Sequence, residues 1–328
     1  SERGHWIATC QESKRQETFQ VRARALVNAA GPWVQQVLQG IAQAKVSGQV
    51  RLIKGSHIVV PRLFHGEHAF MLQNPDGRIV FAIPYEDDFT LVGTTDVPFQ
   101  GDATQVHIAH DEVLYLCTTV NNYFNKTITP ADVKWSYAGV RPLSDDDEQS
   151  ASKVTRDYRL ELTEQPGPLL AVIGGKITTY RRLAEAALDR LQPLLEFNGC
   201  PWTDRASLPG GDIAGADFET FLQSLRARWS FLAETTLRRL ARTYGTRVAR
   251  ILGDARCLED LGIVFGEDVI TEAELRYLQR HEWALTADDV LWRRTKLGLH
   301  LQPSDVGALE RYLRQSQAGV AAQQDGVA

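Results

Sequence analysis

An apolar run that ends in two glycines and passes directly into an amphipathic helix constrains the fold of this 328-residue chain most strongly. The run PLLAVIGG predicts a buried strand that stops at Gly174 and Gly175, and residues 176–195 have the apolar spacing of a helix. Glycines let another group approach the backbone closely, and a helix start offers free N–H groups and a positive dipole end. The sequence therefore predicts an anionic or electron-accepting ligand at this turn.

Three cationic side chains are candidates for holding such a ligand. Lys176 places a positive charge at the helix start, where the dipole disfavours a cation unless a negative partner compensates it. Arg141 and Arg156 are expected at strand ends, and a guanidinium matches phosphate oxygens in a bidentate manner. Together they predict one phosphate site. A solvated lysine, and arginines paired with carboxylates such as Asp145 or Asp157, are the alternatives that the sequence leaves open.

His57 is the candidate general base. It follows Lys54-Gly55-Ser56 and precedes two valines, so we expect it at a strand edge with its imidazole able to reach a cleft. A neutral imidazole can accept a hydroxyl proton, although a surface or structural histidine is the alternative. The later segment Gly93-Thr94-Thr95-Asp96 supplies small and hydroxyl residues at a strand end, and we expect a turn there rather than a ligand site.

Further runs predict the rest of the first two hundred residues. The opening of the chain is expected to form strand, turn and strand, with residues 20–30 as one strand that ends at small residues. Closely spaced strand-like runs between 51 and 96 predict an antiparallel sheet. The segment from His110 to Phe124 has helical spacing. Its expected apolar face consists of Val113, Leu116, Val120 and Phe124.

Residues 201–215, rich in proline and glycine, form the clearest domain boundary, and the pattern beyond them predicts only helices. The net charge of -5 offers no basic field, which argues against nucleic acid as a partner. The four cysteines are isolated in the sequence, so we expect reduced thiols in a cytoplasmic protein and no metal site. No apolar run approaches the roughly 18 residues needed to span a bilayer, so any membrane contact is expected to be peripheral.

Six motifs in a fixed order resemble the flavin-dependent glycerol-3-phosphate dehydrogenases, and the likeness covers practically the whole chain. The helical segment EWALTADDVLWRRTKLG is similar to the C-terminal domain of that family. The six motifs are LVNAAGPW, LIKGSHIVVP, LVGTTD, YAGVRPL, TRDY and GGKITTYRRLAE.

The resemblance implies that the secondary hydroxyl of sn-glycerol 3-phosphate is oxidised to the ketone of dihydroxyacetone phosphate. It also implies that the hydride is transferred to FAD and that the electrons then pass to a membrane quinone. Peripheral contact with the inner face of the cell membrane is implied as well, and oligomer formation is left open. The matching motifs imply that His57 and Arg141 are catalytic, that Arg141, Arg156 and Lys176 hold the substrate, and that Ala30, Gly31, Gly175, Lys176, Thr178 and Thr179 line the cofactor.

The sequence departs from the family at its beginning, because it has no GxGxxG turn of the kind that holds the FAD pyrophosphate. We therefore expect the C-terminal two-thirds of such an enzyme. The expected fold class is α/β, with an α+β substrate domain on a partial FAD-binding Rossmann-like domain, followed by an all-helical C-terminal domain. The expected ranges are 1–48 for the partial FAD-binding domain, 49–165 for the substrate domain, 166–205 for the return to the FAD-binding domain and 206–328 for the helices.

Two other functions fit parts of the same pattern. A non-catalytic module would keep the basic pocket and bind a phosphorylated polyol without flavin. A related amine-oxidising flavoprotein would act on an amino acid instead of an alcohol. Three cations around one small site favour phosphate, so we rank amine oxidation last, and flavin binding would separate the first alternative from the enzyme.

Overall fold

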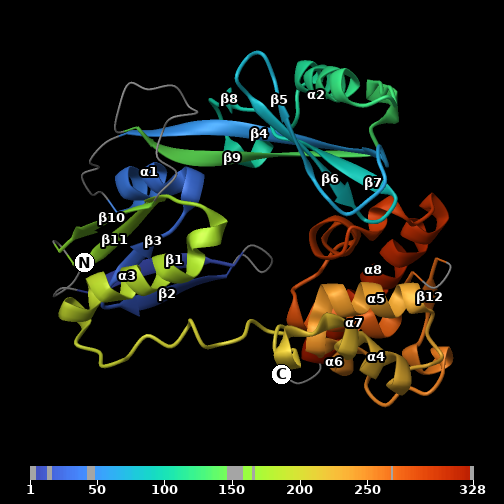
Figure 1. The fold of residues 1–328 in the computed structure, drawn as a ribbon. Helices are drawn as coiled ribbons and strands as arrows, with labels where there is room; N and C mark the ends of the chain where they lie inside the picture. Colours follow the sequence, from blue (N-terminus) through green and yellow to red (C-terminus); the bar gives the residue numbers. More distant parts are fainter. Residues whose placement is uncertain are drawn as a thin grey trace. The chain divides into compact units, whose positions relative to one another are not determined.

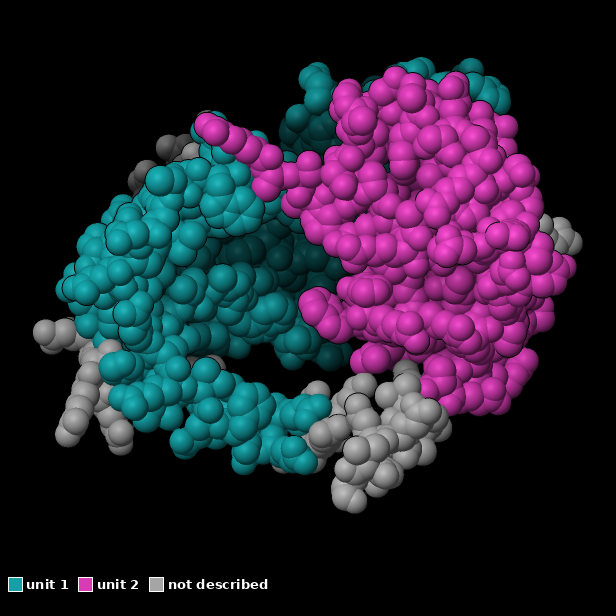
Figure 2. All heavy atoms as spheres, turned by 90° about the horizontal axis from the view of Figure 1, so that it is seen from below, with its two compact units in different colours: residues 1–204 teal, residues 205–328 magenta. Residues whose placement is uncertain are grey.

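A computed structural model describes residues 5–12, 17–42, 49–145, 158–164, 167–266 and 269–325. The chain forms two compact units, Ser1–Asp204 and Arg205–Ala328, which Figure 2 shows in teal and magenta. The division falls inside the segment 201–215, where the sequence predicts a boundary. The finer division of the first unit into three ranges stays a prediction. In the described part of the chain, no helix is both long and apolar enough to cross a bilayer.

The larger sheet of the first unit is antiparallel throughout, as the strand-like runs predict. Its strands lie in the order β5 (Phe70–Gln73), β6 (Ile79–Tyr85), β7 (Phe89–Gly93), β4 (Gln49–Pro61) and β8 (Val97–Pro98). The sixth strand, β9 (Trp135–Asp145), pairs antiparallel with β4 along almost its whole length, so β4 lies in the interior of the sheet.

Helix α2 (His110–Tyr123) covers one face of this sheet, as Figure 1 shows. Its Leu116 and Val120 pack against alternate residues of β4 such as Ile58, which confirms the predicted apolar face. Alternation along each strand directs the intervening side chains to the opposite face. That opposite face carries His57 and Arg141, together with several exposed apolar side chains: Met71, Ile79, Phe81 and Ile83.

A smaller sheet has the strand order β10 (Tyr158–Thr163), β11 (Leu169–Gly174) and β3 (Leu26–Asn28). β11 runs antiparallel to β10 and parallel to β3. After β11 the chain makes a 3-10 turn and enters α3 (Tyr180–Leu195), which confirms the predicted strand, glycine turn and helix.

The first strands differ from the expectation in one respect. β1 (Trp6–Gln11) and β2 (Thr18–Ala23) form the predicted hairpin, but residues 20–30 are not one strand. β2 ends at Ala23, and after a bend the chain starts β3 in the other sheet. The prediction was wrong here because alternation records which side chains point inward but not which sheet a strand joins.

After β3 comes a short helical stretch: a 3-10 turn (Gly31–Trp33), α1 (Val34–Gln36) and one π turn (Val37–Ile41). Apolar side chains of this stretch and of β11 form a separate small core. That core contains Val34, Leu38, Leu169, Ala171 and Ile173.

The second unit is built mainly from helices around its own core. The helices are α4 (Phe218–Arg228), α5 (Glu234–Tyr244), α6 (Val248–Leu252), α7 (Glu272–His281) and α8 (Pro303–Asp325), with a π turn at Asp289–Arg294. Two strands of two residues each, β12 (Val264–Phe265) and β13 (Ile270–Thr271), correct the expectation of helices alone. Such short strands leave no periodicity for a sequence pattern to reveal.

Candidate functional site

His57 lies in the interior of the larger sheet and not at a strand edge, which corrects the expectation. It stands opposite Gly93 of β7 on one side and opposite Tyr137 of β9 on the other. Its imidazole stacks on the Tyr137 ring, with the ring centroids 4.9 Å apart and the planes 8° from parallel. The two neighbouring strands therefore hold the imidazole in one orientation on the face that α2 does not cover.

The glycine at position 93 makes room for this imidazole. A Cβ atom built on Gly93 would overlap the ring of His57, so any larger residue would force the ring to move. Gly93 ends β7 directly beside His57 in the sheet. Gly93, which the sequence predicts as part of a turn, therefore helps to determine where the imidazole of His57 lies.

The surroundings of His57 favour the neutral form of its imidazole. Burial lowers the pKa of His57 below its ordinary value of 6.5, and the positive charge of Arg141 lowers it further. Its Nδ1 atom is buried and has no hydrogen-bond partner among the described residues. A neutral imidazole with this environment can accept a proton at a ring nitrogen.

Arg141 was expected at a strand end, and this prediction was wrong. The residue lies within β9, opposite Ile53, because β9 continues to Asp145. Pro142 does not stop the strand, since β9 pairs with β4 alone in the described part of this sheet and a proline is tolerated at such an edge. Arg141 and Tyr137 are four residues apart on one strand. Arg141 therefore shares a face with His57.

The guanidinium of Arg141 is anchored by the segment that joins β7 to β8. Its Nη2 donates to Thr94 Oγ1 and to the carbonyl oxygen of Thr95, both at 3.4 Å, and lies 3.3 Å from Asp96 Oδ1. A Cβ at Gly55 would clash with this guanidinium, so the glycine leaves the space that the guanidinium occupies. The side chain is still 38% exposed, which lets an anion reach it.

The alternative to a phosphate ligand was that each arginine pairs with a carboxylate such as Asp145 or Asp157, and the structure pairs Arg141 with a different carboxylate, Asp96. Asp157 and the predicted phosphate ligand Arg156 lie outside the described residues, so the role of Arg156 stays a prediction. No group of three His, Cys, Asp or Glu side chains in the described ranges is arranged to hold a metal ion.

The strand-to-helix turn has the backbone that its glycines predict. Gly174 and Gly175 adopt φ values of +73° and +99°, a region that residues with a side chain rarely adopt. The exposed Lys176 precedes the 3-10 turn Ile177–Thr179, and its carbonyl oxygen accepts from the Thr179 N–H at 3.0 Å and from Thr179 Oγ1 at 2.8 Å. Thr178 is exposed, and the side chain of Ile177 is 88% exposed. An apolar side chain this exposed at a helix start suits contact with a flat, partly apolar ligand.

A second segment ends at the same edge of the smaller sheet. β3 runs parallel to β11 with Asn28 opposite Ala171, so the residues after Asn28 leave the sheet toward the same end as the last three residues of β11. The buried Asn28 shapes this turn, because its Nδ2 donates to the Val34 carbonyl at 2.9 Å and its Oδ1 accepts from the Ala30 N–H at 3.3 Å. Gly31 has φ +55° and open space around it. Asn28 was not among the predicted site residues.

The structure brings these two groups of residues near one another through β9. This strand carries Arg141, and it contacts both β11 and the turn Gly31–Trp33. Lys176 follows β11 of the smaller sheet, so it and Arg141 belong to two different sheets, which are in contact through β9 and β11. The sheet that carries His57 and Arg141 therefore contacts the smaller sheet, in which β11 leads through two positive-φ glycines to the start of α3.

Comparisons with known proteins identify matching families for both units. Residues 2–181 match the family described as FAD dependent oxidoreductase. Residues 201–316 match the C-terminal domain of alpha-glycerophosphate oxidase.

Three curated relatives are similar over nearly all of the chain. It is 49% identical over 298 residues to a glycerol-3-phosphate dehydrogenase of Pseudomonas aeruginosa, covering 90% of this chain and 58% of that protein. It is 45% identical to the aerobic glycerol-3-phosphate dehydrogenase of Escherichia coli over 95% of this chain and 62% of the relative. It is 46% identical to a D-erythritol 1-phosphate dehydrogenase of Brucella abortus over 94% and 61%. The chain thus spans about 60% of the length of these relatives.

A solved structure has the same fold. The glycerol-3-phosphate dehydrogenase of Bacillus halodurans, complexed with FAD, superposes with a TM-score of 0.79 at 28% identity. The match covers 94% of this chain and 61% of that chain.

Proposed function

This chain belongs to the family of FAD dependent oxidoreductases, and from that premise we propose that it oxidises sn-glycerol 3-phosphate to dihydroxyacetone phosphate. The names of the relatives from Pseudomonas aeruginosa and Escherichia coli support this substrate. Because the chain spans about 60% of their length, the activity is proposed for the protein to which these two units belong.

One observation carries the proposal: His57 and Arg141 occupy the same face of one sheet, opposite the face that α2 covers. His57 stands opposite Tyr137, and Arg141 lies four residues further along the same neighbouring strand. Burial and the charge of Arg141 lower the pKa of His57, which favours the neutral imidazole that a general base requires. An alcohol that carries a phosphate needs both groups within the reach of one small molecule.

Different residues of the chain bind the phosphate of the substrate and accept the proton of its hydroxyl. The Arg141 guanidinium binds the phosphate, with Lys176 and Arg156 as further cations. His57 accepts the proton of the secondary hydroxyl at a ring nitrogen, and the stacked Tyr137 keeps the imidazole in the orientation that this transfer needs. Desolvation of His57 on the sheet face keeps it from being protonated before the substrate arrives.

The edge formed by β3 and β11 fits FAD, which supplies the acceptor for the hydride that leaves the carbinol carbon. Gly31 has open space around it and Gly175 has a positive φ, so a cofactor can approach the backbone closely there. The segment Lys176 to Thr179 leads into α3, whose N-terminal end carries the positive end of the helix dipole. We propose that Ala30, Gly31, Gly175, Lys176, Thr178 and Thr179 hold the cofactor.

A four-carbon polyol phosphate is the second candidate substrate. The observation that favours it is the 46% identity to a D-erythritol 1-phosphate dehydrogenase, which lies between the 49% and 45% identities to two glycerol-3-phosphate dehydrogenases. Both substrates place a secondary hydroxyl near a phosphate, so the same base and guanidinium serve either.

The electron acceptor and the location are also proposals. We propose a membrane quinone as the final acceptor, and a cytoplasmic protein held against the inner face of the cell membrane. The resemblance to aerobic glycerol-3-phosphate dehydrogenases supports both.

A visible absorption spectrum of the 328-residue chain with added FAD, before and after anaerobic addition of glycerol 3-phosphate, tests the function. Bound flavin that loses its visible absorbance with glycerol 3-phosphate supports the proposal. Loss of absorbance with erythritol 1-phosphate alone favours the second substrate. Phosphate-ester binding without flavin would instead support a non-catalytic binding module, and reduction by an amino acid alone would support amine oxidation.

A further inference from the structure

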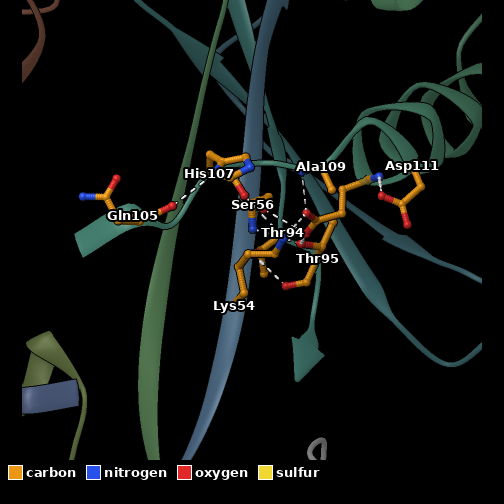
Figure 3. Close-up of polar contacts among 9 residues, drawn as sticks. Lys54, Ser56, Thr94, Thr95, Gln105, His107, Ala109 and Asp111 are labelled. Carbon is orange, nitrogen blue, oxygen red and sulfur yellow. Dashed lines mark hydrogen bonds and ion pairs between the residues drawn. The ribbon is translucent and has the colours of Figure 1, made fainter. Parts of the chain in front are cut away.

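A buried carboxylate, Glu112, stands behind the sheet face that carries the candidate site. Its side chain is only 5% exposed, and it lies in the first turn of α2. Oε1 accepts from Ser56 Oγ at 2.9 Å and from Thr95 Oγ1 at 2.7 Å. Oε2 accepts from the Ala109 N–H at 2.9 Å and lies 2.6 Å from Lys54 Nζ. Figure 3 shows how Lys54, Ser56 and Thr95 gather beside the start of α2.

We call Lys54, Ser56, Thr95 and Glu112 the Glu112 cluster. Burial alone raises the pKa of Glu112, but hydrogen bonds from Lys54, Thr95, Ala109 and Ser56 outweigh it and lower the pKa, so the carboxylate is ionised. Removing an ion pair from water costs several kcal/mol per ion, and a well-packed apolar pair is often as stable. Glu112 caps the start of α2 through the Ala109 N–H, and through Thr95 it also contacts the segment between β7 and β8.

The cluster ties the segment between β7 and β8 to the central strand. The Thr95 side chain is fully buried, and its Oγ1 accepts from the Ser56 N–H at 2.9 Å while it donates to Glu112. The Thr95 N–H also donates to the Ser56 carbonyl oxygen at 3.3 Å. Three hydrogen bonds thus hold one residue of a three-residue connection.

The connection from Thr94 to Asp96 is also the segment that contacts the guanidinium of Arg141. Thr94 Oγ1, the Thr95 carbonyl oxygen and the Asp96 carboxylate all face Arg141 Nη2. In the described part of the chain these contacts fall on Nη2, which leaves the other side of the guanidinium fork for an anion. A shift of Thr95 would move all three oxygens, and the guanidinium with them.

We propose, on the basis of the proposed function, that Thr95 is a positioning residue that acts through Arg141. The Thr95 hydroxyl, held by Glu112, orients the carbonyl and the two neighbouring oxygens that aim the guanidinium at the substrate phosphate. The Glu112 cluster is thus the support of the phosphate site, built on the side of the sheet that the substrate does not touch.

The test compares Thr95→Val, which keeps the shape and removes the hydroxyl, with Thr95→Ser, which restores the hydroxyl. Thr90→Val is the matched control, because Thr90 is a fully buried threonine of the same sheet whose Oγ1 accepts from the Leu63 N–H at 3.1 Å. The dissociation constant for glycerol 3-phosphate is measured by calorimetry. Thr95→Val is expected to raise it about tenfold, the effect of losing one hydrogen bond to a charged group, while the other two variants stay near wild type.

A double-mutant cycle shows whether the effect passes through Arg141. In an Arg141→Ala background, Thr95→Val should cause no further loss of affinity. An equal loss in both backgrounds, or wild-type affinity for Thr95→Val, would overturn the positioning role. If Thr95→Val does not fold, Ser56→Ala, which removes another donor to Glu112, is measured in its place with the same expected direction.

A second readout does not depend on the substrate. Phenylglyoxal modifies accessible guanidinium groups, and peptide mass spectrometry measures its rate at Arg141. Thr95→Val should speed this modification and Thr90→Val should not; an unchanged rate contradicts the positioning role. If Arg141→Ala binds glycerol 3-phosphate as wild type does, the phosphate role of Arg141 in the proposed function fails, while the labelling result still decides the positioning.

Discussion

Two glycines determine where the two reactive side chains of the larger sheet lie. Gly93 accommodates the imidazole of His57, and Gly55 accommodates the guanidinium of Arg141. Both glycines lie in strands, where glycine weakens a strand unless another group must approach closely. Here the approaching group is a side chain of the same face, so these glycines serve the site and not a turn.

We predict that Gly93→Ala moves the His57 ring away from Tyr137, because a Cβ there would overlap the imidazole. The ring-current shift of the His57 Hε1 signal should shrink, and kcat/KM should fall by roughly a hundredfold through misplacement of the base. Gly139→Ala is the matched control, since a Cβ at Gly139 meets no atom within 4 Å. An unchanged Hε1 shift in Gly93→Ala would contradict this account.

The pKa of His57 provides a second prediction at the same scale. Burial and the charge of Arg141 lower this pKa below 6.5, so the active, neutral form is lost only when the pH falls below the lowered value. Arg141→Gln removes the second cause, so the pKa should rise and the acid limb of kcat/KM should move to higher pH. NMR titration of the imidazole measures the pKa directly.

Arg78→Gln serves as the control for this titration. Arg78 pairs with Asp76 and stacks over the Tyr115 ring of α2, on the covered side of the sheet. Removal of its charge should leave the His57 titration where it is in the wild type. A shift toward lower pH in Arg141→Gln would show that the sign of the coupling is wrong.

At the scale of elements, α2 decides which face of the sheet remains available. The helix buries Leu116 and Val120 against one side, and alternation along the strands then leaves His57 and Arg141 on the other. The start of the same helix contributes Glu112 to the support of the segment that seats Arg141. Helix α2 therefore has two effects. It covers one face of the sheet, and its Glu112 holds the segment that contacts Arg141 on the other face.

We predict that Leu116→Ala destabilises the first unit by roughly 2 to 5 kcal/mol, because it leaves a cavity under a fully buried side chain. Leu114→Ala on the same helix is the control, since Leu114 is 44% exposed and little burial is lost. Urea unfolding followed by the fluorescence of the first unit's tryptophans measures the difference. Equal midpoints for the two variants would mean that α2 contributes little to this core.

At the scale of the whole molecule, the chain has separate cores for its two units. In the part of the chain that the structure describes, the buried core of the second unit consists of residues from Leu222 to Leu313. A domain with its own core can fold by itself.

We therefore expect residues 205–328 alone to fold and to melt cooperatively, with a helical circular dichroism spectrum. Leu275→Ala, which removes a fully buried side chain from this core, should lower the melting temperature by several degrees. The control is the exposed Leu285, whose replacement by alanine should have little effect. A non-cooperative melt of the isolated segment would show that the second unit needs the first.

The sequence by itself determined the strand, glycine turn and helix at Gly174 to Leu195, the antiparallel sheet and the face of α2, because each depends on local periodicity and on glycine's backbone freedom. The motifs also led to the family, which the comparisons confirm. Only the tertiary structure decided that His57 lies inside a sheet on Tyr137, that Arg141 is seated on Thr94 to Asp96, and that Glu112 supports that seat. The physical reason is strand register: it pairs residues that are tens of positions apart, and periodicity within one strand does not specify its partner.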